Sequence, residues 1–310
     1  MKRDIVEAIG GTPLVGLPTF GPKRGVHIYG KLEGNNPTGS VKDRIARAMM
    51  EQAEAQGLLT PDRIILEATS GNTGISLAML SSRKGYRLKV VMPENVGQER
   101  IELLRAYGAE IEYSPGDQGT NGAIAVAQIM AAQDSRYLML DQYGNSANPG
   151  AHYETTGPEI IADLPQITHF VAGLGTGGTL MGTGRRLKEY NPGIKVIAAA
   201  PEPSDWIQGL RSLEEGFVPP ILDLSRLDAR IMVNAEESFR TAASLLRHEG
   251  IFAGVSSGAV LAAALRVAHR IDEGHVVCLF ADGGWKYLST NLWTHQYADL
   301  GPEIEGKIWW

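Results

Sequence analysis

The stretch Ile64-Ile-Leu-Glu-Ala-Thr-Ser-Gly-Asn-Thr-Gly74 decides the fold class. Its first five residues have the mostly apolar character of a buried strand, and the small residues that follow open a helix that runs to about Lys84. A second short β-rich run, Leu88–Met92, comes soon after that helix. Because continuously apolar strands separated by helices indicate a parallel sheet covered on both faces, the sequence predicts an α/β protein.

The same alternation continues along the chain in two series. The first series adds strands at 110–113 and 137–140 and helices at about 98–106 and 121–133. The second has strands at 168–172, 195–200 and 276–280 and helices near 179–189, 236–248 and 258–271. Two such series predict two three-layer, parallel-sheet lobes with a cleft between them.

The segment Asn145–Gly150 is rich in turn-forming residues and is the candidate junction between the lobes. We therefore expect an N-terminal lobe over 1–147 and a C-terminal lobe over 148–310, with the first 35 residues or so able to pack on the other lobe.

The composition excludes several classes of protein. The 310 residues are 43% hydrophobic and 21% charged, as in a globular protein with an ample core. A net charge of -6 argues against binding to nucleic acid or to an anionic membrane surface. No apolar run approaches the roughly 18 residues of a membrane span, and the N-terminus carries acidic residues, so we expect a cytoplasmic protein.

Metal and thiol chemistry are not expected either. The seven histidines are scattered along the chain, and a single cysteine cannot build a thiolate-rich metal site. Cys278 lies inside an apolar run, which predicts a buried strand residue rather than a nucleophile.

Lys42 lies in the segment Gly34-Asn-Asn-Pro-Thr-Gly-Ser-Val-Lys-Asp-Arg44, which ends by opening a predicted helix. We expect Ser40 to cap that helix together with Asp43, and the helix to stop at Gly57. The positive end of the helix dipole disfavours a second positive charge, which predicts a lowered pKa for the lysine. Because a neutral amine is a nucleophile, Lys42 is a candidate covalent catalyst, and the alternative is an ordinary solvated lysine.

Three loops of small residues open predicted helices, at Thr69–Gly74, Gly173–Thr179 and Gly254–Gly258. Free backbone N–H groups and the helix dipole make such helix starts anion sites. The hydroxyls of Thr176 and Thr179 add donors to the second loop, whose natural occupant is a phosphate. The alternative is that the small residues only permit tight turns.

The second loop also fits the dinucleotide fingerprint. Gly173, Gly175 and Gly178 have G-x-G-x-x-G spacing after a strand, and Glu202 ends the next strand. A nicotinamide-dependent dehydrogenase is therefore a second interpretation, with His152 as its best proton donor. That interpretation gives no role to the lysine at the helix start or to the other two loops.

Several segments taken together resemble the cysteine synthase family, whose members use pyridoxal phosphate. The segments are Asn35–Arg44, Glu67–Gly74, Asn148–Ile160, Gly175–Thr179, Gly250–Gly258 and Lys286–Thr290. The likeness runs in order from about Ile9 to Thr290 and is greatest with the cysteine synthase B branch. It implies the fold type II architecture of pyridoxal phosphate enzymes, like that of the tryptophan synthase β subunit, and a homodimer.

The resemblance also implies a role for each matching residue. Lys42 would hold the cofactor through an imine and take the substrate α-proton. Asn72 would bind the cofactor's 3' oxygen, and Ser256 would face the pyridine nitrogen. The phosphate would be cradled by Gly175, Thr176, Gly177, Gly178 and Thr179. The substrate carboxylate would be bound by Thr69, Ser70, Gly71, Thr73 and Gln142.

The implied reaction is a β-replacement on an O-activated L-serine. Loss of the leaving group gives a bound aminoacrylate, to which a sulfur donor adds to form L-cysteine or, with thiosulfate, S-sulfocysteine. A neutral serine at the ring nitrogen favours this elimination over transamination. The acceptor, O-acetylserine or O-phosphoserine, stays open, as does the donor, which is sulfide, thiosulfate or a thiocarboxylated carrier protein.

Arg211, in the irregular stretch 201–223, aligns with an arginine of the synthase B branch that resembles a reader of anionic groups. A guanidinium fork suits both thiosulfate and the phosphate of O-phosphoserine.

Further segments resemble a mycobacterial O-phosphoserine type, in which the C-terminal tail folds into the active site and the sulfur donor is a small carrier protein. They are Glu214–Pro219, Asp282–Thr290 and Glu305–Trp310. The region before Lys42 instead reads as in the users of acetylserine and thiosulfate. Trp309 and Trp310 are accordingly interpreted either as active-site residues or as surface or dimer packing.

Overall fold

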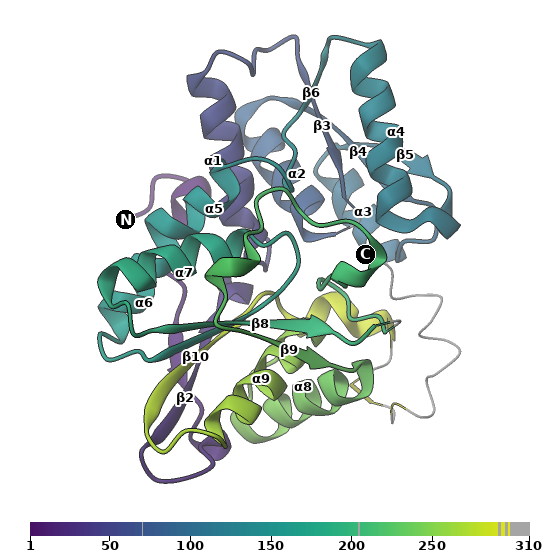
Figure 1. Ribbon diagram of the computed structural model, residues 1–310. Coiled ribbons are helices and arrows are strands. Elements are labelled where there is room, and N and C mark those ends of the chain that lie inside the picture. Colours follow the sequence, from purple (N-terminus) through teal and green to yellow (C-terminus); the bar gives the residue numbers. More distant parts are fainter. Residues whose placement is uncertain (70, 204, 291–292, 295–296, 298–310) are drawn as a thin grey trace.

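The computed structural model describes residues 1–69, 71–203, 205–290, 293, 294 and 297. Figure 1 shows two lobes, one above the other, each built on its own sheet. The two-lobed α/β architecture predicted from the sequence is confirmed. No helix of the described ranges is both long enough and apolar enough to cross a membrane.

The smaller sheet has four parallel strands in the order β5-β4-β3-β6. These strands are β3 (Ile64–Ala68), β4 (Arg87–Pro93), β5 (Glu110–Ser114) and β6 (Tyr137–Met139). The helices of this lobe are α1 (Lys42–Ala55), α2 (Asn72–Lys84), α3 (Gln98–Ala106) and α4 (Gly119–Gln133). All five residues of β3 are buried, as expected for a central strand covered on both faces.

The larger sheet has six strands in the order β1-β2-β10-β7-β8-β9, and β1 alone in it is antiparallel to its neighbour. The strands are β1 (Leu14–Gly16), β2 (Val26–Leu32), β7 (His169–Gly173), β8 (Lys195–Pro201), β9 (Ala229–Val233) and β10 (Gly274–Phe280). Its helices are α5 (Ala147–Ala151), α6 (Gly157–Asp163), α7 (Gly178–Tyr190), α8 (Ala235–Glu249) and α9 (Val255–Ala268).

Short helical turns complete the element order. A π-helical turn, His152–Thr156, joins α5 to α6. The 3-10 turns are Val6–Ala8, Pro18–Phe20, Glu33–Asn35, Gly116–Gln118, Leu213–Glu215, Leu224–Arg226 and Gly284–Thr290.

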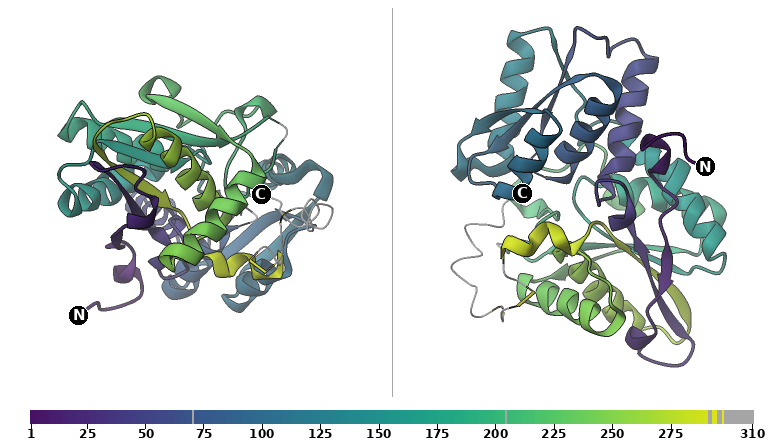
Figure 2. Two further views of the ribbon diagram at one scale, coloured as in Figure 1. Left: turned by 90° about the horizontal axis from the view of Figure 1, so that it is seen from below. Right: turned by 180° about the vertical axis from the view of Figure 1, so that it is seen from behind.

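The two faces of the larger sheet bury different helices. In β7, Phe170 and Ala172 join a cluster with residues of α6 and α7, whereas Val171 joins a cluster with residues of α8 and α9. This alternation follows from the period of two along a strand. Figure 2 shows the same layering from below and from behind.

The sequence missed the strands at the margins of the larger sheet, β1, β2 and β9, and the short helices α5 and α6. The first two strands pair beside β10, although they come from the N-terminal part of the chain. The division after residue 147 stays a prediction.

A buried ion cluster joins the start of α1 to the larger sheet. Arg44 donates to Glu33 through Nε (2.7 Å) and to Glu159 through Nη1 (2.7 Å). Lys31, fully buried on β2, lies 2.9 Å from the same Glu159 carboxylate. Arg44 is itself only 3% exposed, so these charges are compensated by one another rather than by water.

Replacing Arg44 should therefore be costly, because it leaves the buried Glu33 carboxylate unpaired. We expect Arg44→Met to lower the free energy of unfolding by about 3–5 kcal/mol in denaturant titrations. Arg47→Met is the matched control, since Arg47 lies one turn later and makes an exposed pair with Glu51. Its expected loss is below about 1 kcal/mol. Equal losses in the two variants would contradict the role given to the cluster.

Candidate active site

Two adjoining pockets, which form one cleft, lie where the two lobes meet, and most of the predicted site residues line them. The predicted residues on their walls are Lys42, Thr69, Gly71, Asn72, Thr73, Gln142, Gly175, Thr176, Gly177, Thr179, Arg211 and Ser256. Gly178 lies behind this wall as the first residue of α7. Ser70, Trp309 and Trp310 lie outside the described residues.

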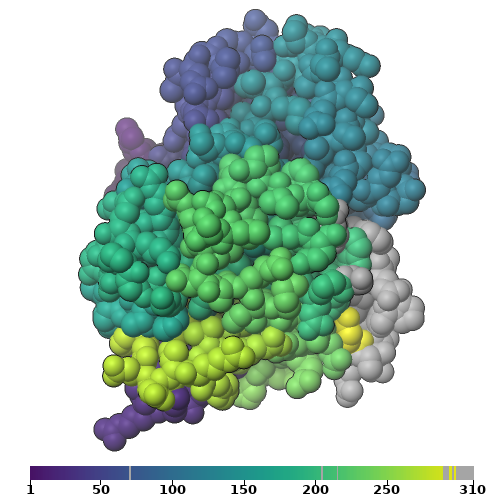
Figure 3. Space-filling model, viewed as in Figure 1, coloured from purple at the N-terminus to yellow at the C-terminus, as the bar shows by residue number. Residues whose placement is uncertain are grey.

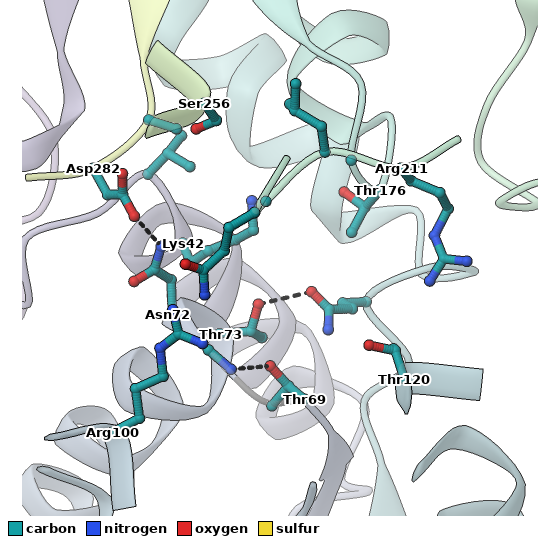
Figure 4. Close-up of a pocket in the computed structure, with 18 of the residues that line it drawn as sticks. Lys42, Thr69, Asn72, Thr73, Arg100, Thr120, Thr176, Arg211, Ser256 and Asp282 are labelled. Carbon is teal, nitrogen blue, oxygen red and sulfur yellow. Dashed lines mark hydrogen bonds between the residues drawn. The ribbon is translucent and has the colours of Figure 1, made fainter. Parts of the chain in front are cut away.

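Lys42 is the first residue of α1, as predicted, and its side chain enters the pocket (Figure 4). Burial lowers the pKa of its ammonium group, against the opposing charges of Asp282 and Glu33. The expected direction is confirmed, but the principal cause is loss of solvent rather than the helix dipole alone.

The predicted cap of α1 is wrong. Val41 occupies the N-cap position and no side chain caps the helix there. The Asp43 carboxylate turns instead to the preceding loop, where it accepts the backbone N–H of Thr38 (2.8 Å), and to the Ser76 hydroxyl (2.5 Å). Ser40 instead accepts the backbone N–H of Lys42 (3.3 Å). The buried donors around Asp43 outcompete the reciprocal bond that a capping box requires.

The loop Gly175–Thr179 packs too closely for larger residues. A Cβ atom on Gly178 would lie 1.8 Å from Oδ1 of Asn148. Asn148 also donates from Nδ2 to the Thr176 hydroxyl (3.1 Å) and so supports the loop from below. Because the first turn of α7 has N–H groups without intrahelical partners, the loop offers a cradle for an anion.

Asn72 is held at both ends of its amide. Its Nδ2 donates to Asp282 Oδ2 (2.7 Å), and its Oδ1 accepts from Lys286 Nζ (2.6 Å). The second oxygen of Asp282 is buried and has no hydrogen-bond partner among the described residues. Burial lowers the pKa of Lys286 to about 8. Asp282 and Lys286 belong to the segment Asp282–Thr290, which resembles that of the mycobacterial type. The sequence did not predict that either residue belongs to the site.

The wall formed by the smaller lobe, which also carries Asn72, holds the predicted carboxylate loop. The Thr73 hydroxyl donates to Gln142 Oε1 (2.7 Å), and both side chains are buried. Arg100 of α3 and Thr120 of α4 line the same side of the pocket, and the sequence reasoning missed both. Arg100 lies in the first turn of α3, directly after β4. A cation at that place in the sequence was the signal that could have identified it as a site residue.

Arg211 is a buried cation, only 5% exposed. Its guanidinium carbon lies 5.3 Å from the ring centre of Tyr143 and 4.8 Å from that of Phe217. Nη1 lies 3.5 Å from Asn121 Oδ1, and no carboxylate of the described residues pairs with it. Figure 4 shows Arg211 and Arg100 on opposite sides of the pocket. A buried cation without an anionic partner indicates an anion as ligand.

The segment that carries Arg211 comes from the larger lobe and reaches the smaller one. The backbone N–H of Arg211 donates to Leu174 O (2.7 Å), which follows β7 of the larger lobe. The N–H of Ile221 donates to Tyr143 O (3.3 Å), which follows β6 of the smaller lobe. In Figure 3 this green segment lies across the junction of the two lobes.

The sequence pattern of the family described as "Pyridoxal-phosphate dependent enzyme" matches residues 5–282. The chain belongs to this family. Cysteine synthase B of Salmonella typhimurium is 44% identical over 299 residues, which cover 96% of this chain and 98% of the relative. The predicted membership of the cysteine synthase family is thereby confirmed.

Solved structures agree with the family. The structure of O-ureido-L-serine synthase has a TM-score of 0.89 at 39% identity and covers 94% of this chain and 95% of its own. A cysteine synthase from Entamoeba histolytica has a TM-score of 0.89 at 34% identity and covers 98% and 96% of the two chains. The fold type II prediction is confirmed, and the family favours pyridoxal phosphate over the dinucleotide alternative.

The pocket of this pyridoxal-phosphate dependent enzyme fits its cofactor. The glycine cradle suits a phosphate, and the Ser256 hydroxyl, in the first turn of α9, makes no hydrogen bond within the described ranges. Lys42 lies on the same walls as both groups. The anion cradle suits the cofactor phosphate, and the unengaged hydroxyl suits the ring nitrogen. The amine of lowered pKa suits the aldehyde, with which it can form an imine.

His152 and Cys278 have structural positions. His152 is 1% exposed, with Nδ1 2.9 Å from the Thr156 hydroxyl and Nε2 3.2 Å from that of Thr179. Burial, helped by the charge of Arg44, lowers its pKa to about 3. Cys278 is buried in β10 as predicted, and burial raises the pKa of its thiol.

The neutral state of His152 makes stability depend on pH. Between its folded pKa of about 3 and its unfolded value, only the unfolded chain takes up the proton, so stability falls as the pH falls. The expected loss through this group is about 1.4 kcal/mol per pH unit below roughly pH 6.5. Denaturant titrations at several pH values should show a shallower slope for His152→Asn. The exposed His269→Asn is a control for the substitution itself, and an unchanged slope in His152→Asn would contradict the role given to His152.

Proposed function

We propose that this chain is a cysteine synthase that performs β-replacement on an O-activated L-serine. The observation that carries the proposal is that the Lys42 amine, the phosphate cradle and the carboxylate loop line two adjoining pockets that share Lys42. The names of the relatives support the same reaction. A homodimer is part of the proposal through the family resemblance.

The proposed roles follow from where each side chain lies. Lys42 Nζ would hold the cofactor covalently and, once freed, accept the substrate α-proton. Gly175–Thr179 would bind the phosphate, and Ser256 would face the ring nitrogen. When bound, the cofactor supplies the electron sink that makes the α-proton removable. Asn72, fixed by its two partners, would direct its remaining N–H at the cofactor's 3' oxygen.

The substrate side would bind and orient the amino acid. Thr69, Ser70, Gly71, Thr73 and Gln142 would hold its carboxylate, which places the α-carbon near Lys42. Once the bound reactants displace water from the pocket, the lysine would keep its proton for return to the product.

Arg211 would bind the anionic group of one reactant. The phosphate of O-phosphoserine and thiosulfate both match a guanidinium fork, and that of Arg211 packs against two aromatic rings. A carrier protein with O-phosphoserine as acceptor is the alternative within the same reaction class, and in it Arg211 would read the phosphate of the acceptor.

An assay of both acceptors with both small donors tests this proposal. O-acetylserine and O-phosphoserine, each with sulfide and with thiosulfate, should be compared in wild type, Arg211→Ala and Arg230→Ala. Arg230 is a matched control because it pairs with Glu214 at the surface. We expect Arg211→Ala to raise KM for the anionic reactant about 10- to 100-fold, the equivalent of one charge-assisted contact.

The same variant should change the reaction of O-acetylserine with sulfide by less than about threefold. Equal losses in all four combinations, or no loss in any, would contradict the role of Arg211. A wild type that turns over none of the four would contradict the proposed function for these small donors, and a thiocarboxylated carrier protein would then be the donor to supply.

A further inference from the structure

Glu67 is a buried acid that the proposed reaction does not use. It lies on β3, is 2% exposed, and no cation pairs with it in the described part of the chain. Its carboxylate accepts the backbone N–H of Asp141 through Oε2 (3.0 Å) and that of Gln142 through Oε1 (3.2 Å). Burial raises its pKa to about 8, with the Asp141 charge adding to the effect. Burying an acid lowers the stability of the fold. The two hydrogen bonds to the backbone of Asp141 and Gln142 are the interactions that Glu67 contributes in return.

The loop that Glu67 holds is strained. Asp141 has φ 53°, and it is the one non-glycine residue of the described ranges with a positive φ. This left-handed conformation is strained for a residue with a side chain. The Asp141 carboxylate accepts the N–H of Gly144 (3.2 Å), which helps to keep the turn closed.

The next residue, Gln142, connects this strained turn to the pocket. Its Oε1 accepts the Thr73 hydroxyl (2.7 Å), and its backbone oxygen accepts from Asn148 Nδ2 (2.7 Å). The same Nδ2 donates to the hydroxyl of Thr176 in the phosphate cradle (3.1 Å). Glu67 therefore fixes the backbone of Gln142, and the side chain of Gln142 in turn contacts Thr73 of the carboxylate loop.

We propose that Glu67 is a positioning residue for the amino-acid substrate: its two backbone hydrogen bonds hold Gln142 where it orients Thr73 toward the substrate carboxylate. The inference rests on the proposed function. A residue that served stability alone would lower the amount of folded enzyme, and with it the apparent kcat, and would leave both KM values unchanged. A positioning residue affects the affinity for the group that it orients.

Glu67→Met tests the proposal, because methionine has a similar length and accepts neither hydrogen bond whatever the protonation of the glutamate. Glu112→Met is the matched control, since Glu112 is exposed on β5 of the same sheet. In Glu67→Met we expect KM for the O-activated serine to rise about tenfold, as for one lost hydrogen bond. We expect kcat, KM for the sulfur donor and the cofactor absorbance to stay within about twofold.

Asp141→Gly provides a second background, because glycine adopts the left-handed conformation without strain. The loop then depends less on Glu67, so Glu67→Met should raise KM by clearly less in Asp141→Gly than in the parent. If Glu67→Met alone is unstable, Asp141→Gly should restore folding. KM is then compared between the double variant Glu67→Met/Asp141→Gly and the single variant Asp141→Gly.

The outcomes separate the inference from the function that it builds on. An unchanged KM for the O-activated serine in Glu67→Met, with or without a lower apparent kcat, would overturn the positioning role while wild type remains active. Equal rises of both KM values together with loss of cofactor would overturn it as well. Failure of wild type and Glu112→Met alike to bind any O-activated serine would overturn the proposed function and the inference together.

Discussion

The burial of the Lys42 amine is the constraint on which the rest of the site depends. Two carboxylates, Asp282 and Glu33, act to keep it protonated, and loss of solvent outweighs them. Glu33 is in turn occupied by Arg44, so most of its charge is neutralised within the ion cluster at the start of α1. The cluster thus fixes the helix that presents the amine and also weakens the nearby charge that would hold its proton.

A chain of hydrogen bonds links the two lobes across the pocket. It runs from Thr73 through the side chain and backbone of Gln142 to Asn148 and the hydroxyl of Thr176. The loop proposed to bind the substrate and the loop proposed to bind the cofactor phosphate therefore share one support. Gln142 contacts the substrate side of this chain directly, whereas the cofactor cradle is reached only through a second amide, that of Asn148.

Local patterns predicted the strands and helices of both sheet centres closely, because buried parallel strands are continuously apolar. They failed for β2, where Lys31 sits in a strand and is compensated by Glu159, far away in the sequence. The same reason explains the wrong cap at Ser40 and the missed Asp282 and Lys286. Their partners come from other elements, and only the folded chain brings them together.

We propose that Lys42, and not the nearby buried Lys286, holds the cofactor. Reduction of the cofactor-loaded protein with borohydride, followed by peptide mass spectrometry, tests it directly. We expect a pyridoxyl phosphate adduct on the peptide that contains Lys42, and its loss in Lys42→Ala. An adduct on Lys286, or no adduct on a protein that carries the cofactor, would contradict it.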